Sequence, residues 1–460
     1  MAGPARHVAI VGAGISGLST AFYLQRHRVP ATLFEQEARL GGLIRTDNVF
    51  DCTLEAGPDS FLAAKPALRQ LAADLHLQHD LIPSNDAQRK IFIVRNGQLV
   101  PLPHGMAMMV PAQMETALQS PLFSEAAKQR FLQELKTPPR DRTEDFTVRT
   151  LVEDHFGPEL LDFVAEPLLA GVYGGDPGNL SAPSVLPRFV EYEQTFGSLI
   201  AGAQQERRTA GAAMFLSFRG GMGQVISALQ ARISAAVPLR TEEALEITRD
   251  PAGTWRLRTT AAEYPATDIV LAVPAYRAAR LLQGVDAALS AELSSIPYSS
   301  AILANLLFPE EAFAHPLNGF GFLVPRPERR LVAAATWINT KFPCRAAPGK
   351  IAIRVFIVEP EASGEMQTPD AALISAVRAD LKRLMGIETQ PLYTSIHRWP
   401  QSMPQYVVGH ASRRARILAS LEELPGLHLV SNYLDGVGIP DCVRWARSAA
   451  AAVRDTFESS

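Results

Sequence analysis

The stretch HVAIVGAGISGLSTAF at residues 7–22 decides the fold. Its apolar residues 8–11 predict a short buried strand that runs directly into G-x-G-x-x-G, and apolar residues at helical spacing follow. In such a unit Gly12 permits the tight turn, Gly14 lets the backbone approach a pyrophosphate, and Gly17 lets the helix pack close to the strand. We therefore predict a dinucleotide-binding α/β fold.

The helix and the next strand extend this unit. Ile15 and Ser16 stand at the predicted start of the helix, whose positive N-terminus attracts phosphate. ATLFEQ at 31–36 predicts a second strand, and Glu35 lies near its end, about 20 residues after the last glycine of the pattern. A carboxylate in that place accepts hydrogen bonds from a ribose diol. Together these features are far more specific than a glycine pattern alone.

Two further glycine-containing stretches favour FAD over NAD as the dinucleotide. ARLGGLIRTD places Gly41 and Gly42 where backbone N–H groups can meet a second phosphate, and Arg45 adds a charge-assisted contact. LEAGPDSF places Gly57 and Asp59 in a turn. One Rossmann unit suffices for a nicotinamide cofactor, whereas the longer FAD needs contacts along its ribityl and ring portions.

The C-terminal stretch GVGIPDC offers one more contact for such a cofactor. It reads as a glycine turn at the start of a helix, whose backbone N–H groups can meet the flavin end of FAD. The alternative is a simple capped helix. We expect FAD to be bound non-covalently, and the candidate cofactor-binding residues in this stretch are Gly436, Val437, Gly438, Ile439 and Asp441.

Length and composition exclude several other classes of protein. The 460 residues allow two or three domains, and 47% hydrophobic with 20% charged residues are typical of a folded protein. A net charge of −3 gives no electrostatic reason to expect nucleic-acid binding. The three cysteines lack C-x-x-C spacing, which argues against zinc and disulfides and fits a reducing cytosol.

The sequence shows no recognisable signal peptide and no apolar run of the ~18 residues that a spanning helix needs. We therefore expect a cytoplasmic protein, with a peripheral contact on the inner face of the cell membrane left open. The stretch 101–124 has four methionines in an apolar context. It reads either as a core filled by adaptable thioethers or as an apolar surface facing lipid or a substrate channel.

The dinucleotide unit is incomplete at residue 60, which indicates a domain assembled from separated segments. ATDIVLAVPA at 266–275 predicts another buried strand, and residues 426–453 read as strand, glycine turn and helix. In between, residues from about 90 to 205 are mostly helix-like, and about 290–360 contain strand-like runs.

From end to end the chain resembles the protoporphyrinogen oxidase family, within the amine-oxidase-like flavoproteins. The wider group is indicated by VGAGISGL, LGGLIRT and GVGIPDC. The second set of motifs is the more specific, above all GVYGGDP together with GFGFLVP. It comprises GPDSF at 57–61, LLAGVYGGDPGNLS at 168–181, FRGGMGQVISAL at 218–229 and HPLNGFGFLVP at 315–325.

This resemblance implies an α/β protein with a Rossmann-type FAD-binding domain assembled from discontinuous segments, a mixed-sheet substrate domain and a helical domain that contacts the membrane. The expected ranges are 1–78, 218–275 and 412–460 for the FAD-binding domain, 79–92, 200–217 and 276–411 for the substrate-binding domain, and 93–199 for the helical membrane-associated domain.

The resemblance also implies oxidation of protoporphyrinogen IX to protoporphyrin IX in haem biosynthesis, with three molecules of oxygen consumed and hydrogen peroxide released. Gly175 would approach the tetrapyrrole through its backbone, and Leu323 and Phe356 would sandwich its pyrrole rings. Thr336 would line the same pocket, and Phe320 would add to its apolar wall. We expect hydride transfer from a meso carbon to the flavin, three times over.

Two positions depart from the family pattern. Many members have an Arg that pairs with a propionate, where QRKIFIV offers Lys90 with Arg89 beside it. Because Lys is a point charge and not a planar fork, the clamp would be looser or would shift to Arg89. Asp59 stands where many relatives have Asn, and it either accepts hydrogen bonds from pyrrole N–H groups or stabilises its turn. The candidate catalytic residues are Asp59, Lys90 and Gly175.

Coproporphyrinogen III is the alternative substrate, slightly favoured by GVGIPDC and by Lys90, although its four propionates call for more than two basic anchors. Further alternatives are an activity like that of monoamine oxidases or desaturases and a non-catalytic flavoprotein that binds a porphyrin. No hydrolytic triad or metal-ligand spacing is recognisable, so we expect no bound metal. His104, His315 and His397 read as surface or loop residues.

The expected partners are the porphyrinogen and molecular oxygen, and no nucleic acid. Handover of the product to a ferrochelatase, a homodimer and the peripheral membrane contact are left open.

Overall fold

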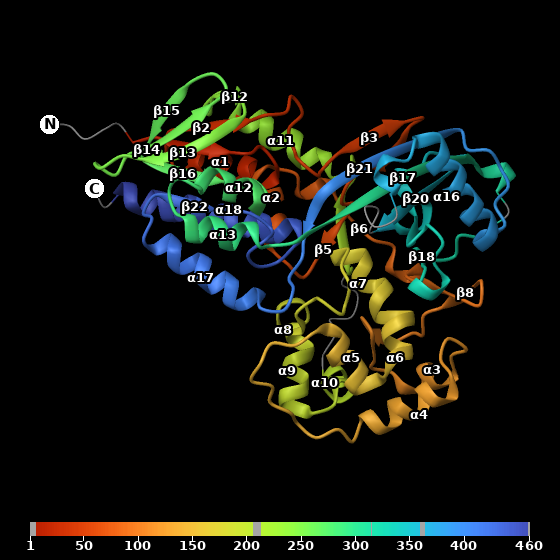
Figure 1. Ribbon diagram of the computed structural model, residues 1–460. Coiled ribbons are helices and arrows are strands. Elements are labelled where there is room, and N and C mark those ends of the chain that lie inside the picture. Colours follow the sequence, from red (N-terminus) through yellow and green to blue (C-terminus); the bar gives the residue numbers. More distant parts are fainter. Residues whose placement is uncertain (1–5, 206–212, 314, 359–363, 459–460) are drawn as a thin grey trace.

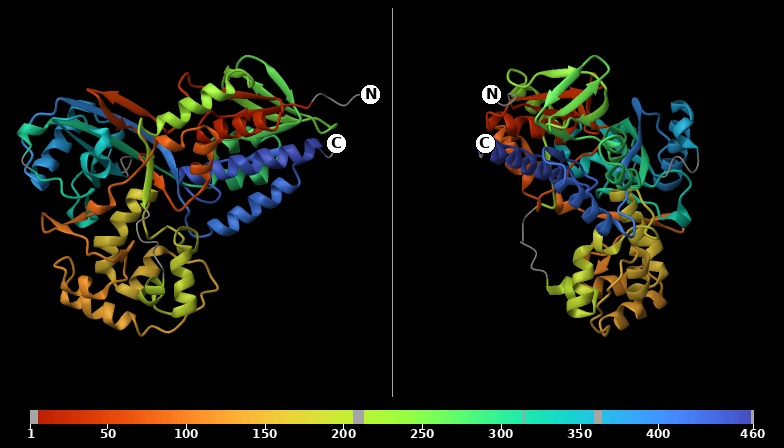
Figure 2. Two further views of the ribbon diagram at one scale, coloured as in Figure 1. Left: turned by 180° about the vertical axis from the view of Figure 1, so that it is seen from behind. Right: turned by 60° about the vertical axis from the view of Figure 1, so that its left-hand side comes forward.

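The computed structural model describes residues 6–205, 213–313, 315–358 and 364–458. Figure 1 shows three parts: a sheet with its helices, a second large sheet, and a group of short helices below them. Both chain ends lie by the first sheet, and the two further views of Figure 2 show the helical part well away from them.

Five parallel strands form the sheet that the glycine pattern predicts. Their order in the sheet is β12 (Leu239–Thr241), β2 (Ala31–Glu35), β1 (Val8–Val11), β16 (Asp268–Leu271) and β22 (Leu427–Leu429). The expected strands near 31, 268 and 427 are therefore confirmed. So is the assembly of this part from distant segments of the chain.

Both faces of this sheet are buried, as expected for parallel strands. Val8 and Ile10 of β1 point into one core, and Ala9 and Val11 point into another. The first core includes α1 (Ile15–Arg26), α2 (Ala67–Asp74), α11 (Gly223–Ile233) and α18 (Ile439–Glu458). The second includes α12 (Ala275–Leu282), α13 (Ala287–Ser294), α17 (His410–Glu422) and the antiparallel strands β13 (Ala244–Arg249), β14 (Trp255–Thr259) and β15 (Glu263–Ala266).

A mixed sheet of seven strands forms the second part. Its order is β21 (Tyr393–Pro404), β17 (Tyr298–Pro309), β20 (Lys350–Val358), β19 (Ala334–Trp337), β18 (Gly321–Leu323), β7 (Ile91–Arg95) and β8 (Gln98–Pro101). Helix α16 (Asp370–Met385) covers one face, where Leu373 and Val377 share a core with Phe322 and Val355. The opposite face of this sheet is left for the candidate site.

Short strands join the two sheets. β3 (Thr46–Val49) pairs with β4 (Cys52–Glu55), and β11 (Phe215–Phe218) lies between β5 (Phe61–Leu62) and β6 (Leu81–Pro83). Trp399 of β21 donates a hydrogen bond to the carbonyl of Ala56, and Asn305 of β17 donates one to the carbonyl of Glu55. The segment after β4 is thus held directly against the seven-stranded sheet.

The third part consists of short helices around one core. Met106 and Met109 are buried in it, and Met108 and Met114 pack against it, which fits the core-filling interpretation of the methionines. The helices are α3 (Met114–Gln119), α4 (Glu125–Glu134), α5 (Val148–Phe156), α6 (Pro158–Leu160), α7 (Glu166–Tyr173), α8 (Ala182–Val185), α9 (Pro187–Phe196) and α10 (Leu199–Gln205).

The helix-like reading from about residue 90 is wrong at its start. Residues 91–101 form β7 and β8, and the expected start of the helical domain at residue 93 falls inside β7. The strand alternates between two cores, with Ile93 in the core of the helices and Val94 in the core under α16. Helix α10 packs on α9, so residues 200–205 lie with the helices as well.

We therefore propose that the helical domain begins after β8 and includes α10. For the remaining boundaries, our proposal is the domain division expected from the sequence. Among the described residues, no helix combines the length and the apolar character that crossing a membrane requires.

Candidate functional site

The glycine pattern forms the turn between β1 and α1. Gly12 has φ +98°, and a Cβ there would lie 2.6 Å from the carbonyl oxygen of Ala272. A Cβ on Gly17 would lie 1.8 Å from the carbonyl oxygen of Gly12, so the helix packs directly on the turn. At Gly14, by contrast, no atom lies within 4 Å of the Cβ position. This arrangement fits the predicted approach of a pyrophosphate to the backbone.

The start of α1 and the end of β2 meet at this turn. Helix α1 begins at Ile15, followed by Ser16, and its N-cap residue gives no side-chain hydrogen bond to the first turn, which suits a phosphate ligand. The Glu35 carboxylate accepts hydrogen bonds from the backbone N–H of Ala13 (2.7 Å) and of Glu37 (3.0 Å). It is thereby fixed beside the turn, where a ribose diol is expected.

Gly41 and Gly42 close the opposite side of the turn. The N–H of Gly41 donates to the carbonyl of Ala13 (2.8 Å), and a Cβ on Gly42 would lie 3.3 Å from the Cα of Gly14. The second predicted glycine cluster and the first are therefore neighbours in space.

Arg45 and Gly57 continue from this cluster toward the second sheet. The Arg45 side chain is exposed, and its Nε donates to Asp47 (3.0 Å), so a phosphate would compete with this ion pair. A Cβ on Gly57 would lie 1.8 Å from the carbonyl oxygen of Leu43. Only glycine permits this close approach of the two backbone segments.

The C-terminal glycine turn has the predicted form. Gly436 has φ +83°, and a Cβ there would lie 2.2 Å from the carboxyl carbon of Asp441. The Asp441 carboxylate accepts from the N–H of Gly438 (3.2 Å) and pairs with Nζ of Lys65 (2.6 Å). The carboxylate of Asp441 is thus engaged by the turn at the start of its own helix and by Lys65. Any contact to a cofactor would therefore come from the backbone of the turn.

This turn also lies beside the first one. Cys442 is in the first turn of α18, and α18 packs along α1, which contains Ser16. Ile439 packs on the core of the first sheet, and Val437 packs on the core of the helical part. The predicted cofactor-binding residues from both ends of the chain are therefore brought together.

One face of the seven-stranded sheet carries three of the predicted substrate-binding residues. The strand register pairs Leu323 with Ala334, Ala334 with Phe356, and Thr336 with Arg354. Directly paired residues point to the same face, as do residues two apart in one strand. Leu323, Thr336 and Phe356 therefore share the face opposite α16, where all three are half-buried.

The backbones of Phe320 and Lys90 meet just before β18 and β7 begin. The N–H of Phe320 donates to the carbonyl of Lys90 (2.7 Å), and the ring of Phe320 is buried while the Lys90 side chain is exposed. Arg89 approaches the sulfur of Met214 (2.9 Å) and the carboxylate of Asp86 (3.7 Å). Arg89 is thus partly engaged by the protein, and Lys90 extends into solvent.

Gly175 lies where the helical part meets the same sheet. A Cβ on Gly175 would lie 1.9 Å from Oε1 of Gln405. The Gln405 amide donates to the carbonyl of Tyr173 (2.6 Å) and to the hydroxyl of Ser299 (2.9 Å), which fixes the loop after α7 against β17. Leu323 packs against the helical core in this region as well.

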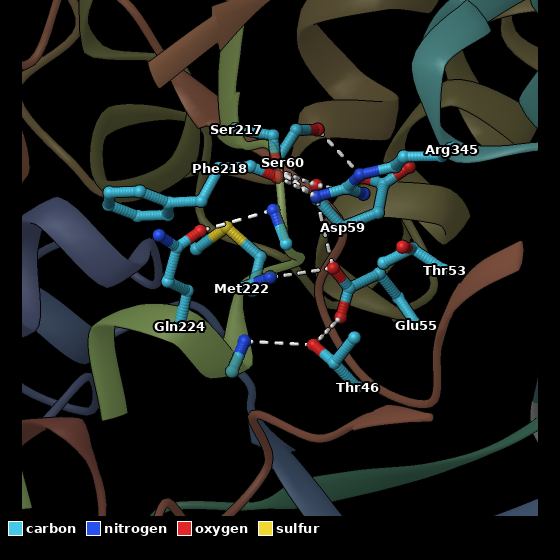
Figure 3. Close-up of polar contacts among 12 residues, drawn as sticks. Thr46, Thr53, Glu55, Asp59, Ser60, Ser217, Phe218, Met222, Gln224 and Arg345 are labelled. Atoms are coloured by element: carbon cyan, nitrogen blue, oxygen red, sulfur yellow. Dashed lines mark hydrogen bonds and ion pairs between the residues drawn. The ribbon is translucent and has the colours of Figure 1, made fainter. Parts of the chain in front are cut away.

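Sequence reasoning missed a group of buried charges on this same side of the sheet (Figure 3). Asp59 forms ion pairs with Nζ of Lys341 (2.8 Å) and with Arg354 (3.2 Å), and Glu55 pairs with Arg345 (3.1 Å). Figure 3 shows the Arg345 guanidinium reaching toward both Asp59 and Glu55. These five residues form what we call the charge cluster. They come from β4, the following loop, α14 (Ile338–Lys341), the 3-10 helix η6 (Pro343–Arg345) and β20.

The charge cluster keeps Asp59 ionised. Burial alone would raise the pKa of Asp59, but the charges of Lys341 and Arg354 outweigh burial and hold this pKa below its usual range. Both carboxylate oxygens are engaged, because the second one accepts a hydrogen bond from Ser60 (2.7 Å). Asp59 can therefore stabilise a developing positive charge, but it is a weak proton acceptor.

A signal for part of this cluster is visible in the sequence. Arg354 interrupts the apolar run KIAIRVFIV two residues before Phe356, so strand alternation alone would place both on one face. In the structure the Arg354 guanidinium lies over the Phe356 ring, 4.6 Å from its centroid. Lys341 and Arg345 follow β19 in α14 and the turn after it, where no comparable pattern predicts a partner.

The interpretation of His397 as a surface or loop residue is wrong. His397 is on β21, its side chain is 9% exposed, and its Nε2 lies 3.5 Å from Asp47. The register pairs Leu303 with both His397 and Phe356, which places His397 on the same face as the predicted substrate-binding residues. His104 is exposed, as expected.

The parallel sheet and the glycine turn between β1 and α1 together define a Rossmann-type α/β protein with a second, mixed sheet. A sequence profile of the family of flavin containing amine oxidoreductases matches residues 15–454. The chain therefore belongs to the flavin containing amine oxidoreductase family, and the resemblance read from the motifs is confirmed at this level.

Individual relatives are similar over nearly the whole chain. Coproporphyrinogen III oxidase of Bacillus subtilis is 30% identical over 97% of this chain and 97% of its own. The chloroplastic protoporphyrinogen oxidase of Nicotiana tabacum is 28% identical over 98% of this chain and 86% of its own. A crystal structure from Exiguobacterium sp. 255-15, described as that of a candidate protoporphyrinogen oxidase, superposes with a TM-score of 0.89 at 30% identity. It covers 99% of this chain and all of that one.

Proposed function

We propose that this protein is an FAD-dependent, oxygen-linked porphyrinogen oxidase of haem biosynthesis. The observation that carries the proposal is the half-buried row of Leu323 and Phe356, with Thr336 beside it, on the sheet face next to residues 57–59. A flexible apolar macrocycle with carboxylate side chains suits an apolar face with a few polar anchors. The names of the similar proteins support the same reaction class.

We propose FAD, bound non-covalently, as the flavin. The turn at Gly12 and Gly14 fits its pyrophosphate, Glu35 fits a ribose diol, and the C-terminal turn at Gly436 suits the flavin end. When bound, FAD supplies the acceptor for a hydride and passes the electrons on to oxygen. Three rounds remove six electrons, so one porphyrinogen and three molecules of oxygen give one porphyrin and three of hydrogen peroxide.

The apolar residues of the site orient the substrate in this proposal. Leu323 and Phe356 hold pyrrole rings and exclude water, and Gly175 brings the backbone of the helical part close to the macrocycle. Lys90, or Arg89 beside it, pairs with a propionate at the edge of the site.

Asp59 acts through its fixed negative charge. Loss of a hydride from a meso carbon leaves positive charge on the macrocycle, which pyrrole N–H groups present to an acceptor. The Asp59 carboxylate can accept such hydrogen bonds in addition to that of Ser60. Lys341 and Arg354 keep it ionised while it does so.

Coproporphyrinogen III is the substrate to test first, with protoporphyrinogen IX as the second candidate. The relative from Bacillus subtilis, which this chain matches along nearly its whole length, has the former activity by name. Four propionates also suit the basic side chains that flank the apolar row. Arg89 and Lys90 are near Phe320, and Arg326, with a 45% exposed side chain paired to Asp176, follows β18.

Aerobic turnover of the purified yellow protein on both porphyrinogens, followed as porphyrin fluorescence against autoxidation blanks, tests this function. A preference for coproporphyrinogen III is the expected result. A preference for protoporphyrinogen IX would change the proposed substrate but leave the proposed reaction unchanged. Turnover of neither, with no bleaching of the flavin by an anaerobic porphyrinogen, would overturn the proposal in favour of a non-catalytic flavoprotein.

A further inference from the structure

The charge cluster is not electrically balanced. Its three cations, Lys341, Arg345 and Arg354, face two carboxylates, Asp59 and Glu55. The cation side chains are 12%, 2% and 4% exposed, so solvent does little to screen them. Each cation has a carboxylate partner, but Asp59 serves two of them, so the cluster has a net charge of +1. A buried net charge is costly unless a ligand uses it.

The position of this charge points to the ligand. Arg354 donates a hydrogen bond to the carbonyl of Gly57, and Arg345 donates one to the carbonyl of Asp59 (3.3 Å). Both guanidinium groups thus hydrogen bond to the backbone of residues 57–59, the segment that is predicted to contact the flavin. Arg354 also lies over the ring of Phe356, one of the predicted substrate contacts. The charge is located between the places proposed for the flavin and for the macrocycle.

We propose that the unbalanced positive charge of the cluster stabilises the negative charge that a bound flavin ring gains when it accepts a hydride. The transfer carries two electrons and one proton from the meso carbon, which leaves one positive charge on the macrocycle and adds one negative charge to the flavin. The macrocycle then returns to neutrality by losing an N–H proton to solvent. This inference rests on the proposed binding of FAD, but not on which porphyrinogen is oxidised.

Substitutions by residues of similar volume can change the net charge of the cluster one unit at a time. Lys341→Met lowers it from one to zero, and Asp59→Asn raises it to two. The double variant Asp59→Asn/Lys341→Met removes the ion pair and restores a net charge of one. If net charge is what matters, the double variant behaves like the unmodified protein although it carries both substitutions.

The readouts are the two-electron reduction potential of the bound FAD and its affinity for sulfite, whose adduct also places negative charge on the ring. We expect the potential to be highest in Asp59→Asn, lowest in Lys341→Met, and nearly equal in the unmodified protein and the double variant. The Kd for sulfite should rise about tenfold in Lys341→Met, since a fixed charge in a poorly screened site is removed. Lys382→Met, with a 64% exposed side chain, is the control and should change neither value.

Three results would overturn this inference. The first is a double variant whose potential follows Lys341→Met. The second is a Lys341→Met protein with an altered KM for the porphyrinogen but an unchanged potential and sulfite affinity, which would assign the charge to a substrate carboxylate. The third result is needed if the variants do not retain FAD. It is a sulfite affinity of the unmodified holoprotein that is no tighter than the sulfite affinity of free FAD.

The same experiments separate this inference from the proposed function. If the FAD potential of the yellow protein follows the charge series but no porphyrinogen is oxidised, the inference is supported and the proposed function is wrong. A protein that oxidises porphyrinogens with no dependence of potential on the charge series would do the opposite. Failure to bind FAD at all would remove both.

Discussion

Leu323 and Phe356 lie in one row of the seven-stranded sheet, separated by the small side chain of Ala334 on β19. Two larger apolar side chains therefore flank a low point on the sheet face. A pyrrole ring of the substrate fits such a surface better than it would fit a row of three side chains of equal size. This geometry leads to the first prediction.

Phe356→Ala and Leu323→Ala should each lower kcat/KM for the porphyrinogen about tenfold or more, since a lost apolar contact costs about 1–3 kcal/mol. The FAD content should stay unchanged because neither residue is predicted to touch the dinucleotide. Ala334→Leu fills the low point and should lower kcat/KM as well.

Leu392→Ala, with a side chain that is 51% exposed, is the matched control and should be neutral. Wild-type kinetics in both Phe356→Ala and Leu323→Ala would show that this row is not the substrate site.

The elements around the glycine turn could be predicted because they depend on local patterns. The spacing of apolar residues and glycines predicts the strand before Gly12, the turn itself and the strand that ends at Glu35 without reference to the rest of the chain. The segment 91–101 could not be read in the same way. Its strands alternate between two cores contributed by distant parts of the chain, and sequence periodicity does not identify these partners.

The charge cluster shows a second limit of sequence reasoning. Asp59 and Lys341 are far apart in the chain, and their ion pair exists only because the fold brings the loop after β4 to helix α14. The family resemblance suggested Asp59, Phe356 and Thr336 as site residues, but it gave no reason to look for a lysine in the helix after β19. Long-range ion pairs of this kind depend on tertiary packing and leave no periodic signal.

The second prediction concerns the open turn. Gly14 has φ −69°, which alanine adopts freely, and no atom lies within 4 Å of its Cβ position. Gly14→Ala should therefore fold with little change in stability but bind FAD at least tenfold more weakly, because the added methyl group occupies the approach of the pyrophosphate. Flavin fluorescence titration and urea unfolding measure the two quantities.

Gly17→Ala provides the contrast. Its Cβ would lie 1.8 Å from the carbonyl oxygen of Gly12, so the free energy of unfolding should fall by about 1–3 kcal/mol together with FAD affinity. Equal behaviour of the two variants would contradict the distinct roles assigned to the glycines.

The third prediction separates the two cations at the edge of the site. Lys90→Met should raise KM for the porphyrinogen about twofold to fivefold and leave kcat unchanged, since an exposed ion pair contributes up to about 1 kcal/mol. Arg89→Met should have the smaller effect, because Arg89 is already close to Asp86. Steady-state kinetics at two salt concentrations checks this, and the Lys90 effect should shrink at high salt. The reverse ranking would assign the propionate to Arg89.

A buried histidine gives the helical part a pH-dependent stability. Nδ1 of His155 lies 2.8 Å from Glu134, and Nε2 lies 3.2 Å from Glu193, which also pairs with Arg142 (2.7 Å). Burial would lower the pKa of His155, but its hydrogen bonds with the two carboxylates outweigh burial and raise this pKa. Burial likewise would raise the pKa of Glu193, but His155 and Arg142 lower it to about 2.

The fourth prediction follows from the signs of these two shifts. Because the pKa of His155 is raised in the folded state, its stabilising contribution is full below the unfolded value near 6.5 and is lost as the pH rises through the folded pKa. The contribution of Glu193 is full above about 4.5 and is lost as the pH falls toward about 2. The opening free energies of α4, α5 and α9, obtained from amide hydrogen exchange after correction for the intrinsic pH dependence of exchange, should therefore be largest in a window between these limits. His155→Gln should lower the local opening free energy by about 3 kcal/mol at pH 6, since it leaves a buried carboxylate without its charged partner. This loss should shrink as the pH rises, and a loss that is the same at pH 6 and at pH 9 would show that His155 is neutral in the folded protein.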